Sequence, residues 1–216
     1  MRLTKFGHAC VRVEHSTEDG RTHVIVLDPG VFTEPEAVDG ATAVLVTHEH
    51  PDHYSADHLR RTNSPVFTIA AVADQIRADA PDVAERLRVV APGEEFDAGV
   101  PVRTVGDKHA VIHPELKRFD NSGYLLDVGG RLVFHPGDAL TPPGCDVEVL
   151  LLPVSAPWLK VSEAIDFARE VKAPTNLAIH DLVYSEIGLG IIDGQLERFL
   201  GERGQSYLRR ASGEDL

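Results

Sequence analysis

The sequence is short of cysteine and of long apolar runs, and both shortages exclude classes of protein. Only Cys10 and Cys145 occur among 216 residues, far apart, so we expect two reduced thiols and neither a disulfide framework nor a cysteine metal site. No apolar run approaches the ~20 residues that cross a bilayer, and no apolar segment follows the charged start Met1-Arg2. We therefore expect a cytoplasmic protein without a membrane segment or a cleaved signal peptide.

Positive charge is also scarce. Lysine and arginine number 21 against 34 aspartates and glutamates, which gives a formal net charge of -13. Because affinity for phosphate backbones rests largely on Lys and Arg, we do not expect a nucleic-acid partner. The sequence has no repeat and no linker rich in Pro, Gly or Ser, so we expect one domain over residues 1–216.

Histidine and aspartate are concentrated after one apolar run. Residues 43–46 read as a buried strand, and the heptapeptide Thr47-His48-Glu49-His50-Pro51-Asp52-His53 follows at once. On an extended chain alternate side chains share a face, so His48 and His50 can reach one cation. Pro51 ends the strand, and Asp52 and His53 then point in another direction that suits a second cation. The heptapeptide predicts a site for two metal ions.

The rest of the chain alternates predicted strands and helices. We expect strands over residues 3–14, 23–28, 66–70, 86–90, 100–105, 123–128, 131–135, 147–152 and 177–179, the first with a bend at Gly7-His8. We expect helices over residues 55–61, 71–80, 162–171 and 193–203. Residues 202–216 carry mixed charge and are expected to form a solvated terminus. His109, Asp138 and His180 each follow a predicted strand, as the heptapeptide does.

The heptapeptide resembles the hallmark of the metallo-β-lactamase-fold hydrolases, and His109, Asp138 and His180 follow in the order of that superfamily. The resemblance implies an α/β fold, a four-layer αββα sandwich. It also implies the ligands of two metals. The first would be held by His48, His50 and His109, the second by Asp52, His53 and His180, and both would be bridged by Asp138.

This ligand set is imidazole and carboxylate without thiolate, which suits Zn²⁺ and also Mn²⁺, Fe or Ni²⁺. A metal-bridging hydroxide is the expected nucleophile, with Asp52 orienting it, and a small ester, lactone or phosphoester is the expected substrate. Zinc β-lactamases usually place Cys where this chain has Asp138, which favours the wider hydrolase group. Many relatives follow this Asp with Thr or Ser, whereas this chain has Ala139. Gly7-His8-Ala9-Cys10, Asp28-Pro29 and the lack of a cap domain most resemble the L-ascorbate-6-phosphate lactonase-like branch.

Other residues have a functional and a structural interpretation. His113 is a candidate proton donor to the leaving group, or a surface loop residue. Candidates for contact with substrate, each with a surface or core alternative, are Asn121, Tyr184 and Trp158. We expect His135 to support the site without binding metal, and His8 to make a hydrogen bond in the core or behind the ligands. Surface positions are expected for His15, His23 and His58.

Two alternatives to a small-substrate hydrolase remain. One is an RNA or cyclic-nucleotide phosphodiesterase, although the acidic charge opposes its RNA form. The other is a non-hydrolytic metal- or ligand-binding protein on the same fold, including a redox di-iron module. The absence of a fused flavodoxin-like domain argues against that module. The expected partner is a small molecule, and a homo-oligomer is compatible with the sequence.

Overall fold

The structure is a computed structural model that describes residues 1–17 and 19–216. Its first sheet has six strands in chain order: β1 (Arg2–Lys5), β2 (Val11–Ser16), β3 (Thr22–Leu27), β4 (Ala43–Val46), β5 (Val66–Thr68) and β6 (Leu87–Val89). Its second sheet has seven strands, in the spatial order β13 (Ser206–Leu208), β12 (Thr175–Ile179), β11 (Val149–Pro153), β10 (Leu132–His135), β9 (Gly123–Asp127), β8 (Pro101–Val105) and β7 (Glu95–Asp97).

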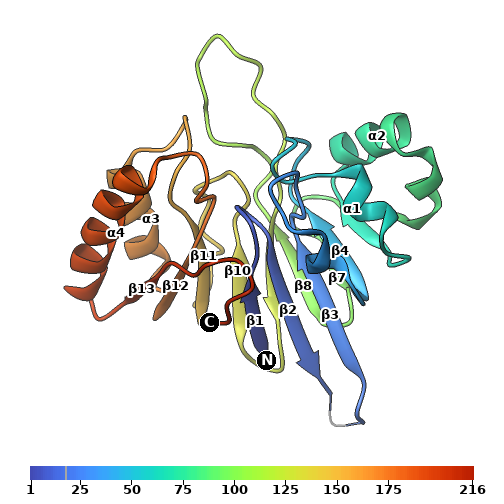
Figure 1. Ribbon diagram of the computed structural model, residues 1–216, viewed down its shortest axis with the longest axis horizontal. Coiled ribbons are helices and arrows are strands. Elements are labelled where there is room, and N and C mark those ends of the chain that lie inside the picture. The colour runs from blue at the N-terminus through green and yellow to red at the C-terminus, as the bar shows by residue number, and fades with distance from the viewer. Residues whose placement is uncertain (18) are drawn as a thin grey trace.

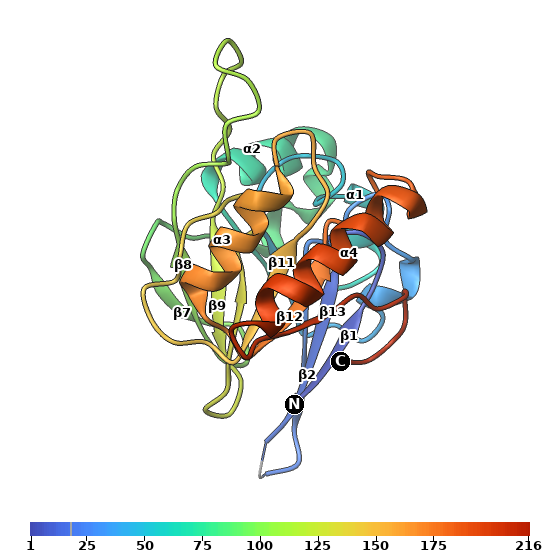
Figure 2. The ribbon, with the colours of Figure 1, turned by 90° about the vertical axis from the view of Figure 1, so that its left-hand side faces the viewer.

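Helices cover the outer faces of the two sheets. Helices α1 (Ala56–Arg60) and α2 (Ala70–Asp79) lie on the side of the first sheet, and α3 (Val161–Val171) and α4 (Glu186–Gly201) lie on the side of the second (Figure 1). Figure 2 shows α3 and α4 side by side across the second sheet. Two short 3₁₀ helices, η1 (Pro35–Val38) and η2 (Pro81–Arg86), join elements of the first half. These layers confirm the predicted αββα sandwich.

The central strands are apolar on both faces because each face meets a different core. In β4, Ala43 and Leu45 pack between the two sheets, whereas Val44 and Val46 pack under α1 and α2. In β11 the same alternation sends Leu151 between the sheets and its neighbours toward α3 and α4. A strand with alternate side chains in two cores must be apolar throughout, which explains these continuous aliphatic runs.

Strand direction gathers the polar residues at one edge. Strands β3 to β6 are parallel to one another, and so are β10 to β13. Strand β8 runs the same way as β10 because both are antiparallel to β9. In sheets of this kind ligands bind beyond the carboxyl ends of the strands. The segments after β3, β4, β8, β10 and β12 begin at those ends.

The predicted strand over residues 3–14 is two strands and not one, because the chain reverses at the predicted Gly7-His8 bend. Strands β1 and β2 form an antiparallel pair around the bend. His8 adopts a φ of 60°, which turns the chain back. A Cβ on Gly7 would lie 1.9 Å from the backbone oxygen of Phe32, so only glycine fits where this bend packs against the loop after β3.

The C-terminal region also differs from expectation. Helix α4 begins at Glu186, earlier than residue 193, with the Ser185 side chain accepting a hydrogen bond from Gly188 N (3.2 Å). Residues 202–216 are mostly exposed, as expected, but they are anchored to the body of the protein: Tyr207 is buried in β13, and Asp215 accepts hydrogen bonds from Arg2 (2.9 Å). The sequence did not predict β7 or β13. None of the helices formed by the described residues is long and apolar enough to span a membrane.

Candidate metal centre

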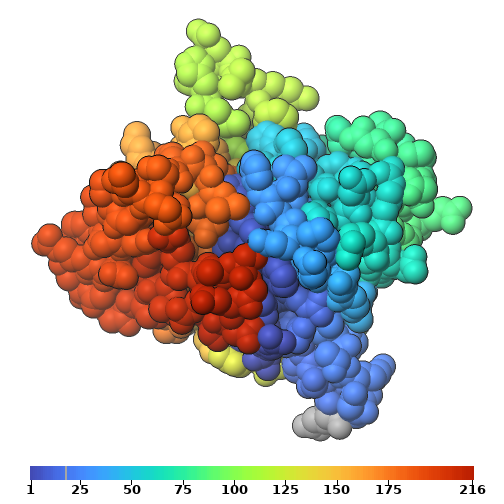
Figure 3. All heavy atoms as spheres, in the orientation of Figure 1, coloured from blue at the N-terminus to red at the C-terminus, as the bar shows by residue number. Residues whose placement is uncertain are grey.

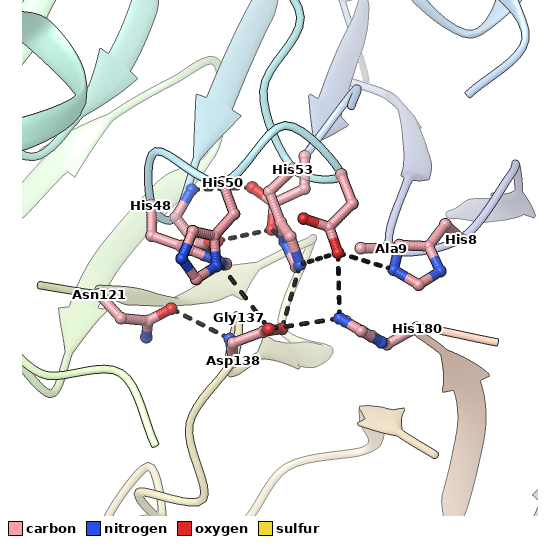
Figure 4. A network of polar contacts seen from close by, with 12 residues as sticks. His8, Ala9, His48, His50, His53, Asn121, Gly137, Asp138 and His180 are labelled. Atoms are coloured by element: carbon pink, nitrogen blue, oxygen red, sulfur yellow. Dashed lines mark hydrogen bonds and ion pairs between the residues drawn. The ribbon is translucent and has the colours of Figure 1, made fainter. Parts of the chain in front are cut away.

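Histidine and aspartate side chains from both sheets meet beyond the strand ends (Figure 4). They form two groups of four residues, and within each group the ligand atoms all lie within 4.8 Å of one another. One group consists of His48, His50, His109 and Asp138; the other consists of His8, Asp52, His53 and His180. The structure therefore brings all the metal ligands that the sequence predicts into these groups and adds His8.

Asp138 lies between the two groups. Its Oδ1 is 3.1 Å from Nε2 of His53, and its Oδ2 is 3.2 Å from Nε2 of His180. Both of these histidines belong to the group of His8 and Asp52. The same Oδ2 is 3.3 Å from Nε2 of His109, which belongs to the group of His48 and His50. Trp158 Nε1 donates a hydrogen bond to Oδ2 (3.0 Å). One buried carboxylate thus faces imidazoles of both groups, as a bridging ligand would.

The loop that carries Asp138 is held by Asn121. The side chain of Asn121 accepts a hydrogen bond from Asp138 N and donates one to Pro136 O, both at 3.0 Å. Gly137, between them, has a φ of 62° and leaves no room for a Cβ, which would lie 2.3 Å from Asn121 Oδ1. Both ends of this buried amide are therefore engaged with the loop, so Asn121 supports Asp138, and its contact with substrate stays a prediction.

Hydrogen bonds at the far side of the rings fix the tautomers of four histidines. Each donates its Nδ1 proton to an oxygen: His48 to Thr47 Oγ1 (3.0 Å), His53 to Asp28 Oδ2 (2.7 Å), His109 to Ala110 O (2.6 Å) and His180 to Ser155 O. Thr47 Oγ1 acts as an acceptor here because its own proton goes to Asp28 Oδ2 (2.6 Å). Such partners orient metal-binding imidazoles, and the four Nε2 atoms point into the centre, where each offers a lone pair once its ring is neutral.

Three buried atoms at the centre make no hydrogen bond of good geometry with the described residues, although His53 Nε2 and Asp138 Oδ1 lie only 3.1 Å apart. They are His53 Nε2, His109 Nε2 and Asp138 Oδ1. Buried polar atoms are nearly always paired, so atoms left free at a convergence of lone pairs fit a bound cation. His50 Nδ1 faces His48 Nε2 at 3.0 Å, close to the ~3.4 Å between two ligands ~2.1 Å from one tetrahedral cation. The residues present therefore fit two metal ions.

His8 has the opposite hydrogen-bond arrangement. Its Nδ1 accepts the backbone N–H of Leu182 (3.2 Å), so the ring proton is on Nε2, which donates to Asp52 Oδ2 (3.1 Å). Burial lowers the pKa of His8 to about 4, which keeps the ring neutral at pH 7. A metal ligand needs a free lone pair on one ring nitrogen, and both nitrogens of His8 are engaged in hydrogen bonds, so His8 is arranged to hold Asp52 in place. In the sequence, the Gly7-His8 bend was the signal for this residue.

The histidines and aspartates at the centre stabilise one another's charged forms. Burial opposes ionisation, yet the charges of Asp138 and Asp28 raise the pKa of His53, and Asp138 raises that of His180 to about 9. The same ion pairs outweigh burial at Asp138 and lower its pKa, and hydrogen bonds from His180 and His8 lower that of Asp52. Both carboxylates are therefore ionised at neutral pH and can attract cations.

Backbone strain is concentrated at the same place. Among the described residues four other than glycine have a positive φ, and three of them, His8, Asp28 and His180, are at this centre. A non-glycine residue in this region costs of order 1–3 kcal/mol and persists only where its surroundings hold it. Here the hydrogen bonds described above hold all three, as expected at a functional site.

A cleft of about 220 Å³ opens onto the centre. Besides five of the metal-ligand candidates, its walls are Ile112, Pro157, Trp158 and Val183. Trp158 therefore lines the cleft. Tyr184 is partly exposed and donates its hydroxyl proton to Ala156 O (2.9 Å), outside the cleft lining.

The segment between β8 and β9 stands away from the body of the molecule at the top of Figure 3. It carries His113, which is exposed and accepts a hydrogen bond from Glu115 N (3.2 Å). Its neighbour Ile112 lines the cleft, and His113 does not. The role of His113 as proton donor stays a prediction, and it requires this segment to move toward the metal centre.

The remaining histidines are structural. His135 is buried behind the centre, accepts a hydrogen bond from Gly137 N (3.0 Å) and approaches Ala9 O (3.1 Å). His58 was predicted at the surface, but it is buried, and burial lowers its pKa. The short helix α1 turns this residue inward toward Gly30 and Thr33 in the loop after β3. His15 and His23 are partly exposed on β2 and β3.

Known proteins are similar to this chain in sequence and in fold. Residues 2–180 match the protein family described as "Beta-lactamase superfamily domain". Protein Rv0786c of Mycobacterium tuberculosis is 39% identical over 203 residues, 91% of each chain. UPF0173 metal-dependent hydrolase NEQ378 of Nanoarchaeum equitans is 22% identical over 83% of each chain. The solved structure of CmlA, a diiron beta-hydroxylase from Streptomyces venezuelae, shares the fold with a TM-score of 0.72 at 14% identity, over 100% of this chain and 53% of that one.

Proposed function

Because this chain belongs to the beta-lactamase superfamily domain family and is a metal-dependent hydrolase, we propose that it binds two divalent cations and hydrolyses a small ester, lactone or phosphoester. The first cation would be held by His48, His50 and His109, the second by Asp52, His53 and His180, and both by Asp138. The observation that carries this proposal is the set of inward-facing Nε2 lone pairs on both sides of Asp138.

Two bound cations would supply an activated water as nucleophile and polarise the oxygen of the scissile group. The chain's own residues prepare the site for this chemistry. His8 Nε2 holds one oxygen of Asp52, which leaves the other to accept a hydrogen bond from the attacking water. Trp158 Nε1 holds Asp138 from the cleft side. Because these donors are fixed before substrate arrives, little reorganisation is needed during the reaction.

Zinc is the cation we propose first. Neutral imidazoles and carboxylates without thiolate suit Zn²⁺, and they also suit Mn²⁺, Fe and Ni²⁺. We also propose that the chain is related to the L-ascorbate-6-phosphate lactonase-like branch, because it carries Gly7-His8-Ala9-Cys10 and the Asp28-Pro29 pair. The partner is a small molecule and not nucleic acid, because the net charge of -13 opposes binding to a polyanion.

The test is a measurement of metal content and of turnover on the same preparations. Protein reconstituted separately with Zn²⁺, Mn²⁺, Fe²⁺ and Ni²⁺ is analysed for metal and assayed on a panel of lactones, thioesters and phosphodiesters. We expect two cations per chain and hydrolysis of at least one class. A protein that binds two cations yet hydrolyses no member of the panel would contradict the proposal. A visible spectrum of the iron-loaded form distinguishes a redox di-iron protein from a hydrolase.

A further inference from the structure

We propose that the substrate of this centre is a neutral ester or lactone whose apolar group lies on Trp158, and not a phosphoester or another anion. This inference rests on the proposed function and narrows its substrate class. It is drawn from the chemistry of the cleft walls, from the apolar side chains around the entrance and from the position of charged groups near it.

Trp158 offers the substrate an apolar surface. Its ring centroid lies 5.7 Å from that of His109 and 6.3 Å from that of His180, so the indole stands beside both groups of ligands. Its single polar atom, Nε1, is already hydrogen-bonded to Asp138. The rest of this partly exposed ring can therefore contact only apolar atoms of a bound molecule or their π-systems.

The other walls continue this apolar surface outward. Ile112, Pro157 and Val183 complete the cleft lining beside the ligands. Beyond the cleft lining, on the side of His8, Phe32 is 53% exposed and lies edge-on to the His8 ring, with ring centroids 5.4 Å apart. Leu182, whose backbone N–H binds His8, is 54% exposed and lines a neighbouring cavity. Exposed large apolar side chains gathered around a reactive centre mark a binding surface.

Cationic side chains are absent from the described residues that line the cleft, and its only acidic ones are Asp52 and Asp138. The β8–β9 segment carries three basic residues, Lys108, Lys117 and Arg118, and none of them lines the cleft. Arg118 donates to His109 O (2.6 Å), and Lys108 pairs with Asp120. Sites that transfer phosphoryl groups usually add Arg or Lys to their metals to hold the phosphate oxygens. Without such a residue, this cleft favours a neutral carbonyl group over a charged phosphate.

The cleft also limits the size of the apolar group. Its volume of about 220 Å³ is below the 300–1,000 Å³ typical of sites for drug-sized ligands. We therefore expect affinity to grow with each methylene group only while that group lies against Trp158 and Val183. Further carbons would extend past the entrance into water.

The experiment compares the metal-loaded enzyme on aliphatic 4-nitrophenyl esters from acetate to dodecanoate. We expect kcat/KM to rise about two- to fourfold per methylene, as burial of apolar surface predicts, and then to level off. The Val183→Asp variant should remove most of this rise. Val89→Asp is the matched control, because Val89 is exposed at 46% and lines a separate cavity.

Binding is measured independently of turnover through Trp158, the only tryptophan. Neutral aliphatic amides of increasing length should change its fluorescence, with dissociation constants that fall along the series in both metal-free and metal-loaded protein. Aliphatic phosphate monoesters of the same lengths should bind at least tenfold more weakly to the metal-free protein.

Three results would overturn this inference while leaving hydrolysis established: turnover that is independent of ester length, tighter binding of the phosphates in metal-free protein, or equal effects of Val183→Asp and Val89→Asp. A change from dimer to monomer in Val183→Asp, with the ester series unaltered, would make the entrance an interface between two copies and would also overturn it. Failure to hydrolyse any ester or phosphoester, with two cations bound, would refute the proposed function itself.

Discussion

At the scale of single residues, the partner of Nδ1 decides what each histidine does. His109 donates that proton to a backbone oxygen and presents Nε2 to the centre, whereas His8 accepts a backbone N–H and keeps its proton on Nε2. The two rings have the same chemistry in isolation. A sequence does not reveal this difference, because the deciding partners, Ala110 O and Leu182 N, are set by the fold.

Replacing Asp138 with Ala should abolish turnover and remove at least one cation, because the carboxylate between the two groups is lost. The strands around it should keep the metal-free variant folded, with a melting temperature close to that of the metal-free parent. Metal analysis, activity and thermal melting test this prediction. Asp120→Ala, at an exposed carboxylate on the same side of the molecule, is the control. A variant that retains two cations and activity would exclude a bridging role.

Replacing His8 with Ala should lower activity or metal affinity by about 10–100-fold, the usual effect of losing a partner behind a metal ligand. The loss should concern the cation on the Asp52 side. His8→Gln supplies an amide N–H to Asp52 and should recover part of it. If His8 itself bound metal, His8→Ala would lose one cation entirely and His8→Gln would not restore it. Competition titrations of both variants with a chelator distinguish these cases.

Metal binding should release protons and strengthen with pH. In the metal-free chain Asp138 raises the pKa of His180 to about 9, although burial opposes this, so the ring is protonated at pH 7. Ligation requires the neutral ring, so loading displaces that proton below pH 9. Apparent affinity should therefore rise from pH 6 to at least pH 9, because the charges of Asp138 and Asp28 also raise the pKa of His53, although burial opposes this. Calorimetric titrations in buffers with different ionisation enthalpies count the protons, and a pH-independent affinity would contradict the prediction.

At the scale of elements, the segment between β8 and β9 contributes Ile112 to the cleft and places His113 outside it. If the segment closes and His113 protonates the leaving group, His113→Ala should slow substrates with poor leaving groups by ~10²-fold or more. Activated nitrophenyl esters should react almost normally. Measuring both kinds of substrate in parallel decides the matter, since equal rates in variant and parent would make His113 a surface residue.

Elements with strong local signals could be predicted from the sequence, and elements stabilised by distant contacts could not. The aliphatic runs of β4 and β11 were found, because burial on two faces leaves an unbroken apolar pattern, and the histidines and aspartates predicted at the strand ends do come together. The start of α4 was missed because Gly188, Gly190 and Gly194 weaken its helical pattern. Strand β13 was missed because it depends on pairing with β12. The position of His8 could not be predicted, because it depends on a reversal of the chain that packs against Phe32.

At the scale of the whole molecule, the charge of -13 predicts weak binding to nucleic acid. Tight binding of RNA releases counterions and so falls steeply with salt. A titration of labelled single-stranded RNA and of a tRNA precursor at low and moderate salt should show neither tight binding nor that slope. Sub-micromolar, salt-sensitive binding together with cleavage, and without turnover of small esters, would support a ribonuclease instead.

The two groups of ligands each draw on both sheets. His48 and His50 follow β4 while His109 follows β8; Asp52 lies in the first half of the chain, and its partner His180 follows β12. During synthesis, the first group is complete only after residue 138 and the second only after residue 180, and each also requires the two sheets to dock. We therefore expect a nascent or misfolded chain to bind metal more weakly than a folded one.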